Sequence, residues 1–92
     1  MAKKVVITPL PKIDGSLNMT VIGCVIRHKR TTLGMTLVDA AALSNLSKQT
    51  YQNIEKGHAT VKVESLLKAC MTLGVKLTII ADSEEQADDE WI

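Results

Sequence analysis

Residues 36–57, TLVDAAALSNLSKQTYQNIEKG, decide the fold of this chain. Thr36 is a good helix N-cap, and the acid three positions later completes an approximate capping box, in which Glu or Gln is the usual partner. This predicts a helix that ends just before Asn45, a residue that tolerates the left-handed backbone found at such ends. Ser47 caps a second helix, which Gly57 ends. The stretch therefore predicts two short helices joined by a tight turn.

The second of these helices has two faces of different chemistry. Tyr51 and Ile54 fall on one side, which we expect to face a core. The opposite arc carries hydrogen-bond donors and no acid: Lys48, Gln49, Gln52, Asn53 and Lys56. Such side chains can bind the base edges and phosphates of DNA. The pattern therefore indicates a surface that contacts nucleic acid.

The run from residue 26 to residue 57 resembles the helix-turn-helix of the Xre or phage-repressor family, and the resemblance continues to residue 75, over more than half of the chain. The matching positions are Ile26, Arg27, Arg30, Gly34, Met35, Thr36, Ala41, Ser47, Ile54, Glu55, Lys56, Gly57, Glu64, Ser65, Leu66, Leu67, Leu73, Gly74 and Val75. Leu37 stands where the family usually has a Gln that touches the DNA backbone. Asn45 replaces the usual turn Gly, which is a mild departure because Asn tolerates the same backbone.

The resemblance implies a mostly α fold, a lambda-repressor-like bundle of four helices that binds double-stranded operator DNA. We expect phosphates to be held by hydroxyls, cations and the backbone amides at the starts of the two helices, through Arg27, Thr36, Ser47, Thr50 and Lys56. Lys48 can donate to guanine O6 and N7. Three amide side chains can bracket adenine N6 and N7: Gln49, Gln52 and Asn53.

The resemblance also implies a buried ion pair, which Arg30 and Glu55 match. The pair would hold the DNA-reading helix against a first helix over residues 18–30, and loss of one partner would leave a buried charge. The inner face of the first helix is Met19, Ile22, Gly23, Ile26 and the stem of Arg30, with Gly23 permitting close helix approach. A fourth helix over residues 63–73 has the apolar stripe Val63, Leu66, Leu67, Cys70 and Leu73, and Gly74 ends it.

The outer face of the first helix is apolar for a solvated surface, with Val21, Cys24, Val25 and His28. Cys24 and His28 stand at i and i+4, a spacing that can hold a metal. Because no second pair of ligands is near in sequence, we expect neither a metal nor a cofactor. We interpret the face as an ordinary surface pair or as a patch that the N-terminal segment covers.

Composition and charge narrow the classes of function. The 92 residues are 46% hydrophobic but include no Phe, so the core must be aliphatic, and small domains of this kind often complete their core by dimerising. Residues 1–76 carry eleven bases against four acids, whereas residues 77–92 carry six acids and no base. No apolar run reaches the length of a membrane span. We expect a cytoplasmic protein, associated with the nucleoid when bound to its operator.

The sequence divides into three parts: an N-terminal arm or strand over residues 1–17, a helix-turn-helix domain with a dimerisation strand over residues 18–81, and an acidic flexible tail over residues 82–92. Residues 3–8 and 75–81 are rich in β-branched side chains. A lone strand is not stable, so the second strand must pair with the first or with its copy in a homodimer. The dimer would use an intermolecular sheet through Leu77, Thr78, Ile79 and Ile80.

The terminal strand and the acidic tail, with Trp91 next to last, make the chain similar to HipB-type antitoxins. In that group a dimer represses its own operon and binds a kinase-like toxin, so the resemblance implies a HipA-like kinase as partner and Trp91 as its anchor. One alternative is a free-standing phage- or plasmid-type repressor without a toxin. Another is an interaction module that keeps the fold without binding DNA, for which Leu37 is the best support.

An enzyme is the least favoured class. The sequence has no phosphate-binding glycine loop and no plausible nucleophile–base pair, and its acids cluster only in the tail. We therefore expect a sequence-specific transcriptional repressor without catalytic activity.

Overall fold

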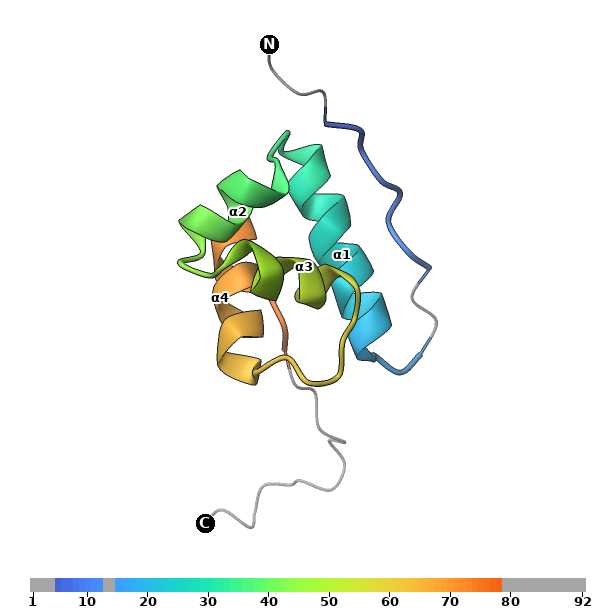
Figure 1. Ribbon diagram of the computed structural model, residues 1–92. Helices are drawn as coiled ribbons and strands as arrows, with labels where there is room; N and C mark the ends of the chain where they lie inside the picture. The colour runs from blue at the N-terminus through green and yellow to red at the C-terminus, as the bar shows by residue number, and fades with distance from the viewer. Residues whose placement is uncertain (1–4, 13–14, 79–92) are drawn as a thin grey trace, which may run out of the picture.

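The computed structural model describes residues 5–12 and 15–78, which include a bundle of four helices (Figure 1). The helices are α1 (Met19–Thr32), α2 (Leu37–Leu43), α3 (Lys48–Glu55) and α4 (Val63–Leu73). The expected mostly α fold is thus confirmed. Ile79, Ile80, Trp91 and the rest of the tail lie outside the described residues. None of the four helices has the length and apolarity needed to cross a membrane.

Local capping signals set the ends of the helices that form the turn. Thr36 Oγ1 accepts a hydrogen bond from the backbone N–H of Asp39 at 3.2 Å, and Ser47 Oγ accepts one from that of Thr50 at 3.0 Å. Between the two helices, Asn45 has a φ of 59°, the left-handed conformation that Asn tolerates better than most residues. All three signals were predicted. Because each acts within a few residues, the helix ends of this segment are set by its local sequence.

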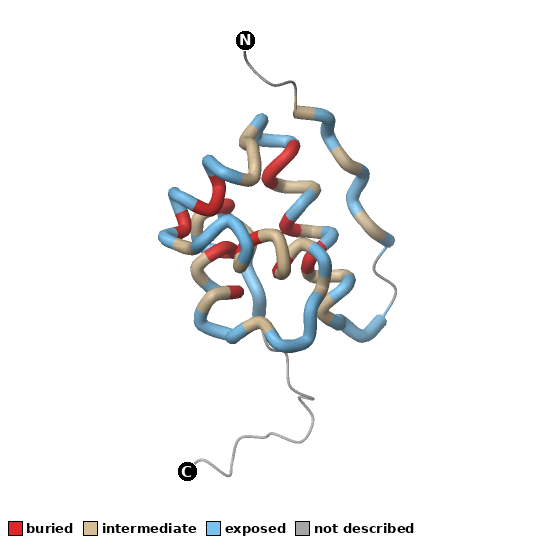
Figure 2. The backbone as a smooth tube through the Cα atoms, in the orientation of Figure 1, coloured by how far each residue is buried: buried red, intermediate tan, exposed pale blue. Residues whose placement is uncertain are grey.

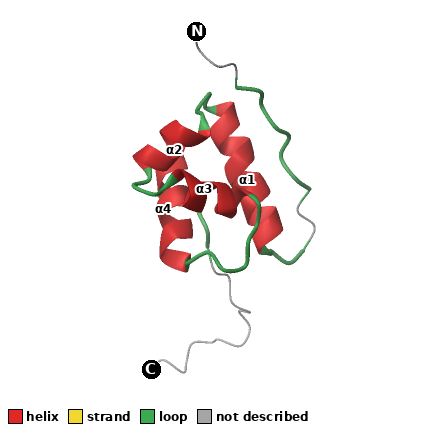
Figure 3. Cartoon of the chain, viewed as in Figure 1, coloured by secondary structure: helices red, strands yellow, loops and turns green. Residues whose placement is uncertain are grey.

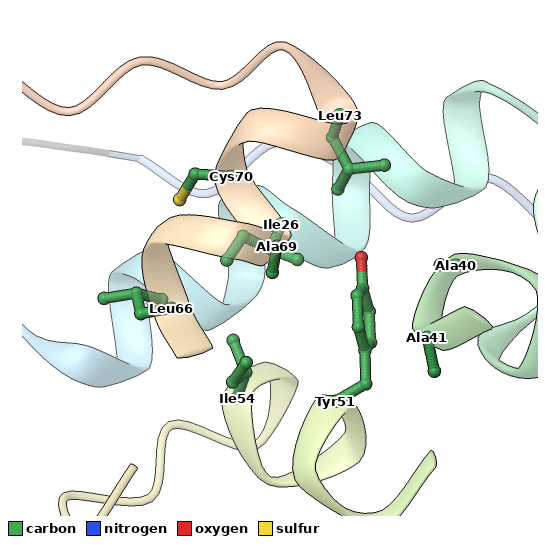
Figure 4. Close-up of a cluster of buried hydrophobic side chains, with 9 residues drawn as sticks. All are labelled: Ile26, Ala40, Ala41, Tyr51, Ile54, Leu66, Ala69, Cys70 and Leu73. Carbon is green, nitrogen blue, oxygen red and sulfur yellow. The ribbon is translucent and has the colours of Figure 1, made fainter. Parts of the chain in front are cut away.

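The core lies between all four helices and is almost entirely aliphatic (Figures 2 and 4). Its buried residues are Ile26, Ala40, Ala41, Tyr51, Ile54, Leu66, Ala69, Cys70 and Leu73. Tyr51 is the one aromatic side chain of this cluster and is fully buried. Burial raises the pKa of the Cys70 thiol, which fits the predicted role of Cys70 as a core residue.

α1 and α3 approach each other closely at Gly23. A Cβ atom on this residue would lie 2.5 Å from the backbone oxygen of Ile54 and 2.6 Å from that of Glu55. Backbone atoms cannot rotate away as a side chain does, so any larger residue would push the helices apart. The predicted close approach is confirmed, and it presses the end of α3 against α1. α1 itself runs two residues beyond the predicted end, to Thr32.

The predicted inner face of α4 was wrong at two positions. Leu66, Cys70 and Leu73 are buried as expected, but Val63 is 69% exposed and Leu67 is 45% exposed. Ala69 is fully buried in their place. A small residue lets α4 pack tightly on its neighbours, so the buried stripe is centred on Ala69 rather than on the larger side chains.

No strand occurs in residues 5–12 and 15–78 (Figure 3), so within the described residues the N-terminal segment is an arm rather than a strand, and the single chain gives no support for a strand over 75–81. Leu77 and Thr78 are exposed. A strand requires a hydrogen-bonded partner along its backbone, and the N-terminal segment finds its hydrogen bonds on α1 instead. Pairing of the 75–81 segment with a second copy of the chain stays a prediction.

The N-terminal segment lies against the outer face of α1, where the sequence left two interpretations open. His28 Nδ1 lies 2.6 Å from the backbone oxygen of Thr8, which confirms the interpretation that this segment covers part of the apolar patch. Cys24 is exposed. Among residues 5–12 and 15–78, no three His, Cys, Asp or Glu side chains gather as a metal site would require.

Candidate nucleic-acid interface

Two buried side chains fix the rotation of α3 about its own axis. Tyr51 and Ile54 are both fully buried, three positions apart on the inner side of the helix. Because they face the core, the opposite side of α3 must face outward. This is the arrangement predicted from the sequence, and it determines which residues can reach a ligand as large as a DNA duplex.

The residues predicted to read bases share that outward side. Lys48 and Gln49 are exposed, and Gln52 and Asn53 are half-buried. Gln49 Nε2 donates a hydrogen bond to Asn53 Oδ1 at 2.9 Å. The bond leaves Gln49 its carbonyl oxygen and a second N–H, the acceptor and donor needed to bracket adenine. The two amides therefore form one hydrogen-bonded unit.

Two hydroxyls predicted to hold phosphate stand together at the start of α3. The Ser47 hydroxyl caps the helix and also donates to the Thr50 hydroxyl at 2.9 Å. Because Thr50 accepts this bond, its own hydroxyl hydrogen stays available for a phosphate oxygen. Lys56, at the other end of α3, is exposed. The polar side of α3 thus has a hydroxyl donor at one end, an ammonium donor at the other and amides between them.

A buried ion pair holds the C-terminal end of α3. Arg30 Nε donates to Glu55 Oε2 at 2.5 Å, and Arg30 Nη2 donates to Glu55 Oε1 at 3.0 Å. The two side chains are only 9% and 7% exposed. Arg30 Nη1 also donates to the backbone oxygen of Met35 at 2.8 Å, so the same guanidinium ties α1, α3 and the turn before α2 together. The predicted structural pair is present.

The other two predicted phosphate contacts lie beside the start of α2. Arg27, on α1, is exposed, and Thr36 is half-buried. They line one hollow together with Leu37 and two residues of the N-terminal segment, Val5 and Val6. Leu37 presents an apolar side chain at this position, so it cannot donate to a phosphate. The hollow thus has a polar part, which includes Arg27 and Thr36, and an apolar part formed by Leu37, Val5 and Val6.

A second hollow borders the α3 surface. Thr50 and Asn53 line it from α3, and Thr60, Lys62 and Ser65 line it from the following loop and the start of α4. Two hydroxyls and an ammonium group beside the amides extend the polar surface past α3. The signal in the sequence was weak, because short polar residues after a helix usually mark only a solvated loop.

The Tyr51 hydroxyl has no hydrogen-bond partner within the described part of the chain, although it is buried. Figure 4 shows it directed toward Leu73, among aliphatic side chains. Burial, followed by the negative charge of Glu55, raises the pKa of this phenol well above its ordinary value. The sequence predicted where the ring lies but gave no sign that its oxygen would be unpaired.

Comparison with known protein families finds a match over this part of the chain. A family model described as helix-turn-helix matches residues 26–80, which is more than half of the chain and includes all of α2, α3 and α4. No curated protein matches the sequence.

Proposed function

Because the chain belongs to the Xre and lambda-repressor-like helix-turn-helix family, we propose that it is a transcriptional repressor that binds a specific operator through α3. One observation carries the proposal: α3 turns an uninterrupted set of Lys, Gln and Asn side chains outward while its other side is fully buried. A surface held this firmly can present the same donors and acceptors to every base pair it meets. The proposal includes no catalytic step.

Binding of DNA requires cations at the edge of the reading helix. Arg27, on α1, and Lys56, at the end of α3, are both exposed. Phosphate contacts position a protein on the duplex, and base contacts give the sequence preference. We assign Arg27, Thr36, Ser47, Thr50 and Lys56 to the first role, and Lys48, Gln49, Gln52 and Asn53 to the second.

The repressor is proposed to act as a homodimer. A single α3 covers few base pairs, whereas a twofold pair can read half-sites one helical turn apart, or a multiple of one turn. Leu77 and Thr78 are exposed at the end of the described chain and lead into Ile79 and Ile80. An intermolecular sheet through these four residues would supply the partner that a strand needs.

The finer proposal is that the chain is the antitoxin of a HipA-like kinase. It is supported by the sequence of the tail, with six acids in residues 77–92 and Trp91 next to last. Acids are repelled by DNA phosphates, so the tail would stay off the operator and be steered to a basic surface on the toxin, with Trp91 as anchor. The alternatives are a free-standing repressor and an interaction module that does not bind DNA.

Fluorescence anisotropy with DNA from upstream of the native gene tests the main proposal. We expect the protein to bind this DNA more tightly than a shuffled duplex. The logarithm of the binding constant should fall linearly with the logarithm of the salt concentration. Equal affinity for both duplexes at every salt concentration would contradict sequence-specific repression. An interaction module would show no salt-dependent DNA binding at all.

Expression of the untagged native operon tests the antitoxin proposal separately. We expect a kinase-like protein to copurify with the full chain and to be lost when residues 82–92 are deleted or when Trp91→Ala is introduced. DNA affinity should hold or rise slightly after the deletion, because a like-charged segment has been removed. Copurification that both variants leave unchanged would mean that the tail is not the docking element.

A further inference from the structure

Three large apolar side chains on the outer face of α4 are left out of the core. Val63, Leu67 and Met71 are 69%, 45% and 79% exposed. They stand at i, i+4 and i+8, so they form one row along the helix, which we call the α4 row. The buried residues of α4 are Leu66, Ala69, Cys70 and Leu73. The row therefore lies beside the buried face of α4 and not within it.

α2 contacts α4 on another side of the helix. Ser44 Oγ donates to Thr72 Oγ1 at 3.1 Å, and Thr72 lies five positions after Leu67. At about 100° per residue, that places the α2 contact about 140° around the helix from the centre of the row. Single apolar residues on a surface are common, but several that adjoin indicate a contact surface for another protein. The α4 row is of the second kind.

Charged side chains border one edge of the row. α4 contains one acid and one base, Glu64 and Lys68, which directly follow Val63 and Leu67 in the sequence. Because they are four positions apart, both lie along the same edge of the row. The other edge adjoins the buried face of the helix. A partner that covers the row must therefore meet one negative and one positive charge, side by side.

The row and its charged edge are complementary to a second copy of themselves. If two α4 helices pack antiparallel about a twofold axis at Leu67, that residue meets its own copy and Val63 meets Met71, because both lie four residues from the axis. A helix rises about 1.5 Å per residue, so Glu64 lies about 4.5 Å from the axis and Lys68 of the second copy about 1.5 Å, on the same side. Opposite charges are then offset by only about 3 Å along the helices. A twofold axis therefore joins apolar residues to apolar residues and acid to base.

We propose that the outer face of α4 is a contact surface for a second copy of this chain, with the α4 row at its centre and two Glu64–Lys68 ion pairs at its edge. It is separate from residues 77–80, proposed above for the dimer, and it contains no residue assigned to DNA. A protein with two self-complementary surfaces assembles beyond the dimer. Two repressor dimers would therefore meet through α4 and assist each other on neighbouring operators. The α4 contact does not depend on the proposed function, but this consequence does.

Exchange of the two charges tests the arrangement. All variants carry Ile79→Pro, so that pairing through residues 77–80 does not mask the α4 contact, and sedimentation velocity measures association. Glu64→Lys and Lys68→Glu each place like charges together at both ion pairs, and each should associate about two- to tenfold more weakly than the Ile79→Pro parent. An equimolar mixture of the two should recover the association, because opposite charges then meet at both positions. A surface for an unrelated protein would not show that recovery.

A charge within the row tests its apolar part. Leu67→Asp should abolish association, since two carboxylates would face each other at the axis. Val38→Asp is the matched control, because Val38 is also apolar and 56% exposed but lies on α2. Circular dichroism checks that the variants fold.

Two outcomes would overturn the inference and leave the proposed function standing. One is an Ile79→Pro parent that is monomeric at every concentration at which it stays soluble. The other is a mixture of Glu64→Lys and Lys68→Glu that associates no better than its components. Failure of the unmodified protein to bind its operator would instead overturn the proposed function alone, because self-association through α4 is measured without DNA.

Discussion

Arg30 and Glu55 form a two-point ion pair that joins the end of α1 to the end of α3. Both of the carboxylate oxygens accept from the guanidinium, at 2.5 and 3.0 Å, and neither side chain is more than 9% exposed. The pair lies next to the contact at Gly23, where the two backbones already approach too closely for a Cβ. Packing and charge therefore fix the same end of α3.

Removal of one partner of this pair should be strongly destabilising. Arg30→Met would leave the Glu55 carboxylate buried without its partner, and the expected loss in free energy of unfolding is about 3–5 kcal/mol. Urea unfolding measures it. The double variant Arg30→Met/Glu55→Leu should be more stable than Arg30→Met, because no buried charge remains. A single variant as stable as the unmodified protein would show that the pair is not buried in solution.

Base-reading and phosphate-binding residues should give different phenotypes. Lys48→Ala should cost about 1–3 kcal/mol of operator affinity and relax the preference at one or two base pairs. Lys56→Ala should weaken binding to all sequences alike and lower the salt slope by about 1. Measuring the affinity of each protein variant for a panel of operators with single-base changes distinguishes the two effects. An identical profile for both variants would show that α3 does not lie in the groove as proposed.

The hydrogen bond from Gln49 to Asn53 should make these two residues non-additive in operator binding. Gln49→Ala removes the donor that orients the Asn53 amide, so a second change at Asn53 should then cost less than it does alone. We expect a coupling free energy of at least about 0.5 kcal/mol in a double-mutant cycle. Gln49 with Lys56, a pair for which the structure records no hydrogen bond, serves as the control. Strict additivity for Gln49 and Asn53 would mean that each reads DNA independently.

Tyr51→Phe should leave the protein as stable as before or make it more stable. The buried hydroxyl has no partner in the described residues, and an unsatisfied buried polar group costs about 1–3 kcal/mol. The phenol pKa is raised on folding, so stability from this group is present below the unfolded value of about 10 and falls as the pH rises above it. The difference in unfolding free energy between Tyr51→Phe and the unmodified protein should therefore grow in favour of the variant above about pH 10. A variant that is less stable at neutral pH would reveal a partner for the hydroxyl.

Proline at position 79 should disrupt the proposed dimer. Ile79→Pro removes a backbone donor from the segment expected to pair with its copy, so monomers should increase. Sedimentation at micromolar concentration measures the change, and Ile79→Val is the matched control because it keeps the donor and the β-branched shape. A monomeric unmodified protein that still binds its operator tightly would contradict the dimer.

The sequence predicted those parts of the fold that depend on neighbours in the chain. Thr36 and Ser47 each cap a helix by accepting a hydrogen bond from a backbone N–H three residues later. Such local contacts can be predicted from the sequence. The burial of Ala69 could not be predicted from the sequence, because a small side chain adds little to a hydrophobic pattern even where it packs well. Thr31 was also missed as a contact of Thr8, since the two residues are 23 positions apart.

The sequence could not decide whether the N-terminal segment forms an arm or a strand, for a related reason. β-branched residues indicate an extended backbone, but they do not identify the partner that would complete a ladder. Thr8 instead makes its hydrogen bonds to side chains of α1. The candidate interface was predicted more fully than the core of α4, because the outward side of α3 follows from helical periodicity once Tyr51 and Ile54 are buried.

The two sides of α3 do not share residues, and this makes the chain a suitable scaffold for retargeting. The fully buried side chains are Tyr51 and Ile54, whereas Lys48 and Gln49 are exposed. An engineer could exchange the exposed Lys48 and Gln49 for other residues and leave the buried Tyr51 and Ile54 in place. Libraries confined to these surface positions should therefore keep their melting temperature while their preferred operators diverge.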